Sequence, residues 1–447
     1  MHYAATLSSE QIAYAALDAV VVLKLHQIQL EALAKENRNL VYALMRDAQK
    51  AIAKLELNGI YFDATAHAAL MERWKIEKEA AEVELRKTIG SAINPNSSKQ
   101  LSKWFRENLD GNLLLDWPRT EKGQLKTDKN TLVLFSDHPL VQPLLKYKEC
   151  STRLSTYGEN FRSHIHPITG RIHPNLRLGK AKTGRMSCES PNLQNSPRER
   201  EYRALFCSPP GRVLVIADYG QIELRVAALV SGDRAMLEAY ALGVDLHRKT
   251  AAAIARIPLD QVTKEQRQAA KAVNFGLLYG QGAEGLARYA KITYGVNMTL
   301  EEAEKARNAF FATYPDLWKW QRRSSTRAEQ EMKVTTPGGR VRDFRKESKG
   351  YRYTESLNTP IQGGAAEVLL AALARLDRSI EEEKIDAKLV NVVHDEIILE
   401  VVEADADRAK KLLETAMVKG MQEVFPNACT KDLVEAHIGK NWAEAKS

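Results

Sequence analysis

The chain has 447 residues, of which 44% are hydrophobic and 27% are charged, and its four cysteines are scattered without the spacing of a metal site. These values are typical of a folded protein of two or three domains, and they exclude a disordered polymer, a fibrous repeat and a small disulfide scaffold. Lysine and arginine outnumber aspartate and glutamate by 65 to 57, which favours a polyanionic partner only weakly, because basic solvated surfaces are common.

Helical patterns dominate the start of the chain. Apolar spacings of three and four predict helix over residues 8–58, with Ser8 or Ser9 as the N-cap, and a second amphipathic helix over residues 64–89. The polar stretch 94–100 predicts a loop that contains residues typical of a helix N-terminus. No apolar run is long enough to cross a membrane. Proline, glycine and basic residues predict exposed loops at 117–129 and 162–203.

Two regions later in the chain predict strands. Residues 212–218 form an apolar run typical of a buried strand, and residues 388–402 form two apolar arms around a polar centre. Residues 233–333 have an almost wholly helical pattern, and one further helix is expected over 360–384, beginning at Pro360. The chain therefore combines helices with a small sheet.

Carboxylates stand at the ends of both strand regions. Asp218 ends the first region, and His394-Asp395-Glu396 forms the turn of the second. Two strands of one sheet could bring Asp218 and Asp395 together, where the carboxylates would repel each other unless divalent cations bound between them. Two Mg²⁺ ions about 4 Å apart would activate an attacking hydroxyl and neutralise a leaving pyrophosphate, which favours phosphoryl transfer. The alternative is that each acid merely faces water.

A second constellation lies on the expected helix that begins at Thr263, which forms a capping box with Gln266, and stops at Gly280. Two cations and two aromatic residues recur every four positions and share one slowly winding face, namely Arg267, Lys271, Phe275 and Tyr279. Such a stripe can hold a triphosphate at its basic end and stack a base at its aromatic end. The alternative is an amphipathic surface helix.

Several polar residues in loops and at helix ends are weaker candidates for contacts with a ligand. Their side chains suit phosphate, sugar or minor-groove contacts, although such residues more often cap turns or are structural. They are Arg185, Asn192, Gln194, Asn195, His247, Asn358 and Gln362.

Three segments, in this order, closely resemble motifs A, B and C of family A DNA polymerases. They are Asp218-Tyr-Gly-Gln-Ile-Glu-Leu-Arg225, Arg267 to Gly280, and Val393-His-Asp-Glu396. The resemblance covers nearly all of residues 50–447 and implies an α+β fold shaped as a right hand, with a thumb, a palm built on an antiparallel sheet, and helical fingers. The implied division is a remnant of a 3′-5′ exonuclease domain at 1–30, thumb and connection at 31–160, palm at 161–232, fingers at 233–338, and the rest of the palm at 339–447.

The activity that the resemblance implies is template-directed DNA synthesis with release of pyrophosphate. Two Mg²⁺ ions, for which Mn²⁺ can substitute, would be bound by Asp218, Asp395 and the backbone carbonyl of Tyr219. The implied partners are primer-template DNA and deoxynucleoside triphosphates, and the implied state is a monomer. The expected location is the cytoplasm of a bacterium or of a phage-infected cell, with an organelle as the alternative.

The resemblance also assigns residues to the substrates. Glu223 would exclude a 2′-hydroxyl as a steric gate, and Lys271 would also assist catalysis. The implied nucleotide-binding residues are Arg267, Lys271, His247, Phe275, Tyr279, Gln221 and Glu223. The implied DNA contacts are Arg185, Asn192, Gln194, Asn195, Asn358, Gln362 and His394.

Several features depart from the family pattern. Gly220 stands where serine is usual, and Thr354 stands where arginine is common, so a duplex contact is in doubt there. Tyr14 and Asp18 match the last motif of a proofreading exonuclease, but the upstream acids are absent, and no proofreading is expected from this chain alone.

Two other functions stay open. The chain could be a catalytically silent DNA-binding module, against which the intact acid pair argues. It could also be a single-subunit RNA polymerase with a related hand, against which Glu223 and Phe275 argue.

Overall fold

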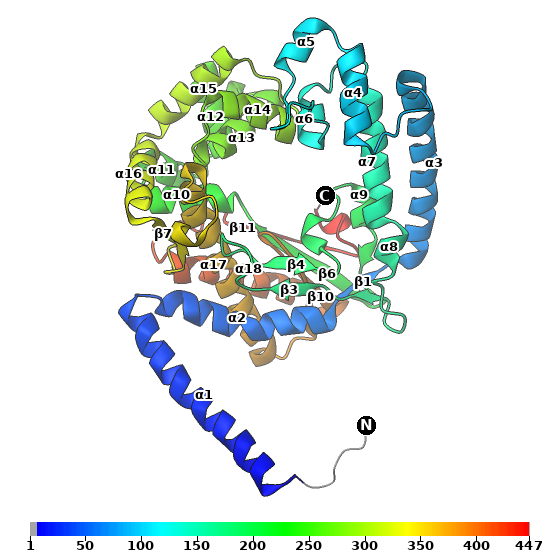
Figure 1. The fold of residues 1–447 in the computed structure, drawn as a ribbon. Coiled ribbons are helices and arrows are strands. Elements are labelled where there is room, and N and C mark those ends of the chain that lie inside the picture. The colour runs from blue at the N-terminus through cyan, green and yellow to red at the C-terminus, as the bar shows by residue number, and fades with distance from the viewer. Residues whose placement is uncertain (1–6, 447) are drawn as a thin grey trace.

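A four-stranded antiparallel sheet lies at the centre of the fold (Figure 1). The computed structural model describes residues 7–446, so the first six residues of the predicted 1–30 unit, and Ser447, lie outside the described residues. The strand order is β11-β6-β10-β9. The bounds are Arg212–Tyr219 for β6, Ala387–Val393 for β9, Glu396–Val402 for β10 and Val434–Gly439 for β11.

Both predicted strand regions are confirmed. The first strand continues one residue beyond the predicted end, to Tyr219, and the second region is a hairpin whose turn contains His394 and Asp395. The apolar residues of β6 are buried, and helix α18 (Ala406–Val424) packs against β6 and β11. Helix α18 also contacts β10, and nearly all apolar side chains of the two middle strands are buried.

Helix α17 (Tyr353–Glu382) shows where the sequence-based prediction was wrong. The helix begins seven residues before Pro360 and contains this proline in its interior. Proline costs about 3 kcal/mol there. Most of the helix is buried and packs against α18 and α2 (Asn39–Asn58), and the Thr359 hydroxyl donates to the Glu355 carbonyl at 2.7 Å. The free energy gained by burying this helix therefore outweighs the local cost of a proline in its interior.

One group of helices, α10 to α16, stands on one side of the sheet (Figure 1). The helical pattern predicted over 233–333 is confirmed, and so is the capping box of α13, in which Thr263 and Gln266 exchange backbone-to-side-chain hydrogen bonds. Helix α13 ends at Leu278, so Tyr279 is the residue after the helix and not its last turn. The bounds are Ile222–Ser231 (α10), Arg234–Leu242 (α11), Leu246–Ala255 (α12), Lys264–Leu278 (α13), Ala283–Tyr294 (α14), Leu300–Thr313 (α15) and Pro315–Glu331 (α16).

A second group of helices, α3 to α8, rises on the other side (Figure 1). Its upper part has a separate apolar core that runs from Ala81 to Cys150. Lys291 of α14 pairs with Asp137 at 2.6 Å, so the two groups touch at their tips. The bounds are Ala64–Ile89 (α3), Ser98–Asn108 (α4), Gly111–Asp116 (α5), Lys129–Leu134 (α6), Gln142–Tyr157 (α7) and Glu159–Arg162 (α8). Helix α3 therefore has the predicted bounds, whereas the predicted loop 94–100 already turns into helix at Ser98.

The predicted helix 8–58 is two helices, α1 (Ser9–Lys35) and α2 (Asn39–Asn58). Ser8 caps α1, which extends away from the rest of the molecule (Figure 1). Within residues 7–446, no helix combines the length and the apolar character that crossing a bilayer requires. The remaining short elements are β1 (Ile60–Phe62), β2 (Arg171–Ile172), β3 (Asn175–Arg177), β4 (Ser187–Glu189), α9 (Arg200–Arg203), β5 (Phe206–Cys207), β7 (Lys333–Thr335) and β8 (Val341–Asp343).

Candidate active site

Acidic residues from distant parts of the chain lie side by side at one end of the central sheet. Glu396 of β10 is opposite Asp218 of β6, and Asp395 occupies the adjoining turn. The backbone N–H of Tyr219 donates to the Asp395 carbonyl at 3.4 Å. The fold therefore brings together Asp218, Tyr219 and Asp395, the three residues that the resemblance connects with metal ions.

The acidic cluster holds excess negative charge. Burial, and then the nearby charge of Asp218, raise the pKa of Asp395 to about 6. Burial also raises the pKa of Glu396, whose Oε1 atom is buried without a hydrogen-bond partner. Carboxylates close together repel each other, and a cation between them relieves the repulsion. A cation bound between these carboxylates would therefore stabilise their ionised forms.

Lys446 is a residue that the sequence analysis missed. Its ammonium lies 3.1 Å from Asp218 Oδ2 and also pairs with Glu396. Lys446 belongs to a short 3₁₀ turn, Glu444–Lys446, that follows β11 and returns toward β6. No motif in the sequence indicates this contact, because it arises only when β11 pairs with β6.

Helix α13 supplies the two cations of the predicted stripe. Arg267 donates to Asp245 Oδ2 through Nη2 at 2.7 Å and through Nε at 3.2 Å. Lys271 is partly buried, and burial followed by the charge of Arg267 lowers its pKa. A lysine whose pKa is lowered by a like charge lies in a positive field, which suits a polyanionic ligand.

His247 is buried against helix α13. Its ring is 2% exposed on the first turn of α12, and its Nδ1 is 2.8 Å from Asn274 Nδ2. Burial lowers its pKa to about 4, so the imidazole is neutral near pH 7. The ring centroid is 5.8 Å from that of Phe275. His247 would reach a phosphate only after the helices around it moved.

Two predicted residues from different segments, Arg185 and Tyr279, meet at Glu223. The Tyr279 hydroxyl donates to the Glu223 carboxylate, and Arg185 forms an ion pair with the same carboxylate. Gln362 also hydrogen-bonds Tyr279. Gln221, by contrast, points toward Asp245, with 3.5 Å between its Nε2 and Oδ2. Glu223 is therefore held in one orientation by two partners.

A cavity of about 260 Å³ lies beside the acids, and four of the predicted DNA contacts, Arg185, Asn192, Gln194 and His394, help to line it. Asn192 also accepts a hydrogen bond from the Gln194 N–H, so its amide oxygen has a structural partner. Burial, and then the charge of Arg185, lower the pKa of His394. These residues come together around Asp395.

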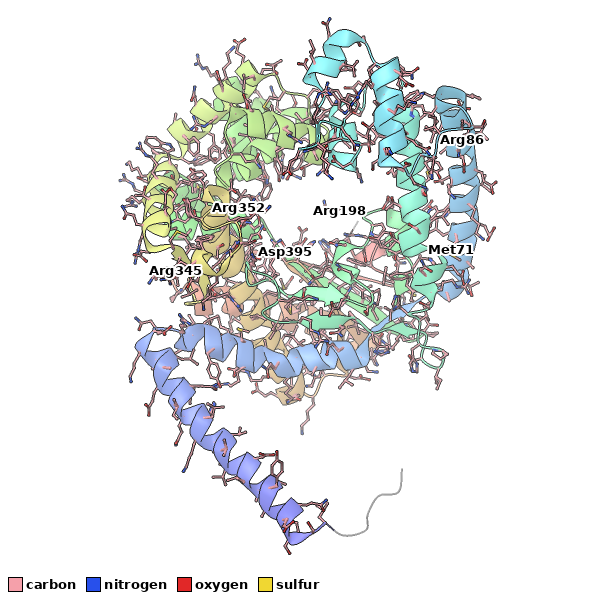
Figure 2. The ribbon with its side chains drawn as sticks, in the orientation of Figure 1. Met71, Arg86, Arg198, Arg345, Arg352 and Asp395 are labelled. Atoms are coloured by element: carbon pink, nitrogen blue, oxygen red, sulfur yellow. The ribbon has the colours of Figure 1, made fainter. Side chains whose placement is uncertain are left out.

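The other predicted DNA contacts are more scattered. The Asn195 carbonyl accepts a hydrogen bond from the Tyr157 hydroxyl at 2.6 Å. Asn358 lies in α17, where its Oδ1 atom is buried without a partner. Arg198, which the sequence analysis missed, is exposed, and Figure 2 shows it with Asp395 in the central part of the molecule, between the two groups of helices. Its charge adds to that of Arg185 at His394.

The two departures from the family pattern have different structural settings. A Cβ atom on Gly220 would lie 2.9 Å from the Asp432 carbonyl oxygen, so a serine would require a shift of this backbone. Thr354 is exposed in the first turn of α17. The glycine therefore fits its surroundings, and nothing in the structure explains the threonine.

Comparisons with known proteins agree on one family. The family described as DNA polymerase family A matches residues 65–444. DNA polymerase I of Aquifex aeolicus is 33% identical over 467 residues, which cover 99% of this chain and 77% of that protein. DNA polymerase I of Pseudomonas aeruginosa is 33% identical over 450 residues, which cover 97% of this chain but only 47% of that protein.

A solved structure is similar over almost the whole chain. It is the polymerase domain of Pol1 from M. smegmatis, described as a complex with DNA primer-template and dNTP. The TM-score is 0.82 at 29% sequence identity, and the match covers 96% of this chain and 75% of that chain.

Proposed function

The chain belongs to DNA polymerase family A, and on this basis we propose that it extends a primer on a DNA template by adding deoxynucleotides to the 3′-hydroxyl. The observation that carries the proposal is the meeting of Asp218 and Asp395 at one end of the central sheet. Primer-template DNA and deoxynucleoside triphosphates are the proposed substrates of a monomeric, cytoplasmic enzyme. The solved relative with both bound supports this reading.

The residues at the sheet end fit divalent cations. The Glu396 Oε1 atom is buried without a hydrogen-bond partner, and the charge of Asp218 adds to burial in raising the pKa of Asp395. Asp218, Asp395 and the Tyr219 carbonyl would hold two Mg²⁺ or Mn²⁺ ions, which would make the primer hydroxyl more acidic and neutralise the leaving pyrophosphate. Among residues 7–446, no cluster of three or more His, Cys, Asp or Glu side chains has the arrangement of a metal site. Mg²⁺ usually completes its coordination shell with substrate phosphates and water, and bound nucleotide would supply the remaining ligands here.

The helix α13 would bind the triphosphate. Arg267 would exchange Asp245 for a phosphate, and Lys271 would add a second charge near the leaving group. Phe275 and Tyr279 would lie against the sugar and base. Because His247 is buried and neutral, it would join the phosphate site only after α13 moved toward the sheet.

The predicted division of the hand is retained as part of this proposal. The separate core from Ala81 to Cys150 supports a thumb within residues 31–160, and the helices α11 to α16 support fingers within 233–338. The palm would consist of residues 161–232 and 339–447, which contribute all four strands of the central sheet. Cavity-lining residues such as Arg185 and Gln194 would contact the duplex without reading its sequence.

Residues 1–30 are proposed to be part of an exonuclease-type unit that does not proofread in this chain. Tyr14 and Asp18 are exposed on α1, and Tyr14 is 69% exposed. Two-metal hydrolysis needs further acids around such a pair. We therefore expect no excision of a mismatched primer end by this chain.

The proposed activity is tested by extension of a primed template with Mg²⁺ and all four deoxynucleotides. We expect extension of a matched primer and no shortening of a primer with a terminal mismatch. A chain that binds the duplex but incorporates no nucleotide would be a DNA-binding module, and shortening of the mismatched primer would contradict the absence of proofreading.

Replacing Glu223 by alanine is expected to relax the discrimination against ribonucleotides by about 100-fold. The Glu223 side chain is held by Arg185 and Tyr279, and a methyl group would leave room for a 2′-hydroxyl. The measurement is the ratio of incorporation efficiencies for a deoxynucleotide and the matching ribonucleotide. Glu223→Gln is the control, because it keeps the size of the side chain and should keep most of the discrimination. A Glu223→Ala enzyme as selective as the wild type would contradict the gate.

A further inference from the structure

Lys446 lies between Asp218, a proposed metal ligand, and the neighbouring acid Glu396. Its ammonium is 3.1 Å from Asp218 Oδ2 and forms an ion pair with Glu396, whose side chain is only 4% exposed. The lysine side chain itself is 31% exposed. A positive charge thus lies on the carboxylates before any metal ion is present.

The surrounding turn holds Lys446 in this place. Trp442 is fully buried, and its backbone N–H donates to the Phe206 carbonyl at 2.9 Å. Ala445 is also fully buried, and its N–H donates to the Asn441 carbonyl at 3.2 Å. Ala445 is therefore fixed against the core, and this packing places the adjacent Lys446 next to the acids.

Lys446 is the main counter-ion of the acidic cluster. Asp218, Asp395 and Glu396 are the acids, and Glu223 adds negative charge farther away at Asp395. Arg203 also acts on Glu396 through its charge, but its guanidinium lies over the Trp442 ring, 4.5 Å from the centroid. Within residues 7–446, Lys446 is the cation that forms ion pairs with Asp218 and Glu396.

We propose that Lys446 is a built-in counter-ion that stabilises the acidic site before metal binding and competes with a divalent cation for Asp218. This inference rests on the proposed metal site. The lysine tip can swing away because it is partly exposed, whereas Glu396 keeps its place in β10. Lys446 is thus a positioning residue that sets how tightly the site binds its cation.

The expected consequence has a definite sign. A divalent cation that binds between these carboxylates must displace the ammonium or tolerate its repulsion at a distance of a few ångströms. Neutralising the lysine should therefore tighten divalent binding by about tenfold. The same change should lower the melting temperature of the metal-free protein, because the acids lose their counter-ion.

The test is a titration of the whole chain with Mn²⁺, in which free Mn²⁺ is measured by its electron paramagnetic resonance signal. Lys446→Gln should bind Mn²⁺ about tenfold more tightly than the wild type, and Lys446→Arg, which keeps the charge, should stay within about threefold of it. Lys440→Gln is the matched control, because Lys440 is a neighbouring surface lysine that pairs with Glu403. Melting in EDTA provides the second readout.

The outcomes separate this inference from the proposed function. Equal or weaker Mn²⁺ binding by a folded Lys446→Gln variant would overturn the inference, and weaker binding would show that the lysine organises the acids for the metal. Asp395→Asn tests the site itself. If it binds Mn²⁺ as well as the wild type does, the proposed metal site is wrong, whereas a loss of binding in Asp395→Asn with no change in Lys446→Gln defeats only the role of the lysine.

Discussion

Replacing Asp395 by asparagine is expected to reduce the rate of primer extension by about 10³-fold or more. The substitution preserves the shape of the side chain but removes the charge that would hold a metal ion between β6 and β10. Loss of such electrostatic stabilisation costs several kcal/mol of transition-state energy, and each 1.36 kcal/mol is a factor of about ten in rate. The measurement is single-turnover incorporation of one deoxynucleotide at saturating substrate.

The same substitution should leave the fold intact. Burial and the charge of Asp218 both penalise the ionised form of Asp395, so an amide removes a repulsion in the metal-free protein. Asp407→Asn is the matched control, because Asp407 is an exposed acid on α18. Extension by Asp395→Asn at more than a tenth of the wild-type rate would contradict the catalytic assignment of Asp395.

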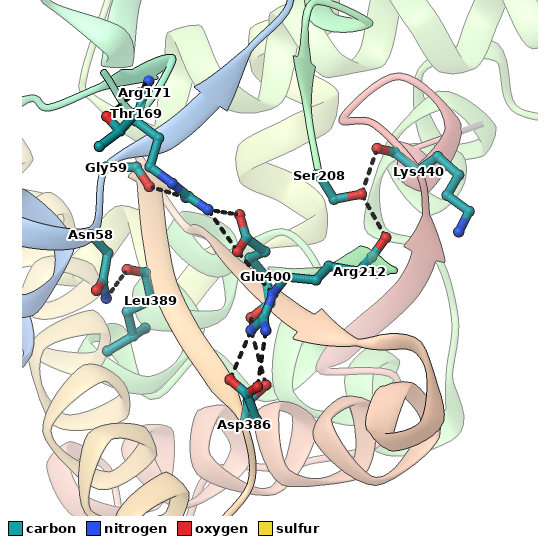
Figure 3. Close-up of polar contacts among 10 residues, drawn as sticks. All are labelled: Asn58, Gly59, Thr169, Arg171, Ser208, Arg212, Asp386, Leu389, Glu400 and Lys440. Atoms are coloured by element: carbon teal, nitrogen blue, oxygen red, sulfur yellow. Dashed lines mark hydrogen bonds and ion pairs between the residues drawn. The ribbon is translucent and has the colours of Figure 1, made fainter. Parts of the chain in front are cut away.

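Replacing Glu400 by alanine is expected to lower the free energy of unfolding by about 3 kcal/mol. Glu400 lies on β10, is completely buried, and accepts two hydrogen bonds from Arg171 at 2.7 and 2.8 Å (Figure 3). Arg212 Nε lies 2.9 Å from its Oε1 atom. Removing the carboxylate would leave Arg171 nearly buried without its acidic partner, and an uncompensated buried charge is strongly destabilising.

Urea unfolding followed by circular dichroism measures this effect. Arg212 would retain Asp386, with which it pairs at 3.0 Å, so most of the loss should come from Arg171 (Figure 3). Glu403→Ala is the control. Its ion pair with Lys440 is solvent-exposed and should contribute no more than about 1 kcal/mol. If Glu400→Ala and Glu403→Ala had the same free energy of unfolding, the ion pairs of Glu400 would not stabilise the sheet as inferred.

Local signals in the sequence predicted many elements correctly because the responsible interactions lie within a few residues. The capping box of α13 needs only Thr263 and Gln266, and the bounds of α3 follow from an amphipathic pattern between caps. Pro360 shows the limit. Its effect depends on how deeply the surrounding helix is buried, and no local pattern reports that burial.

The residues of the candidate site show the same difference between local signals and tertiary contacts. The order of the motifs indicated which residues to examine, including Glu223 and Tyr279, although nothing local indicated that they touch each other. Nothing local indicated the hydrogen-bond partner of His247 either, because Asn274 reaches it from another helix. The motifs therefore supplied candidates, and the packing of helices against the sheet supplied their partners.

The sequence by itself determined the capped starts of helices such as α13, the apolar strands and the family to which the chain belongs, since these depend on residue type and short-range spacing. Only the tertiary structure decided that Glu396 lies opposite Asp218 and that Lys446 reaches both. Strand register and the course of the turn after β11 are set by contacts between segments far apart in the chain, whose free energy is gained only when the whole sheet assembles.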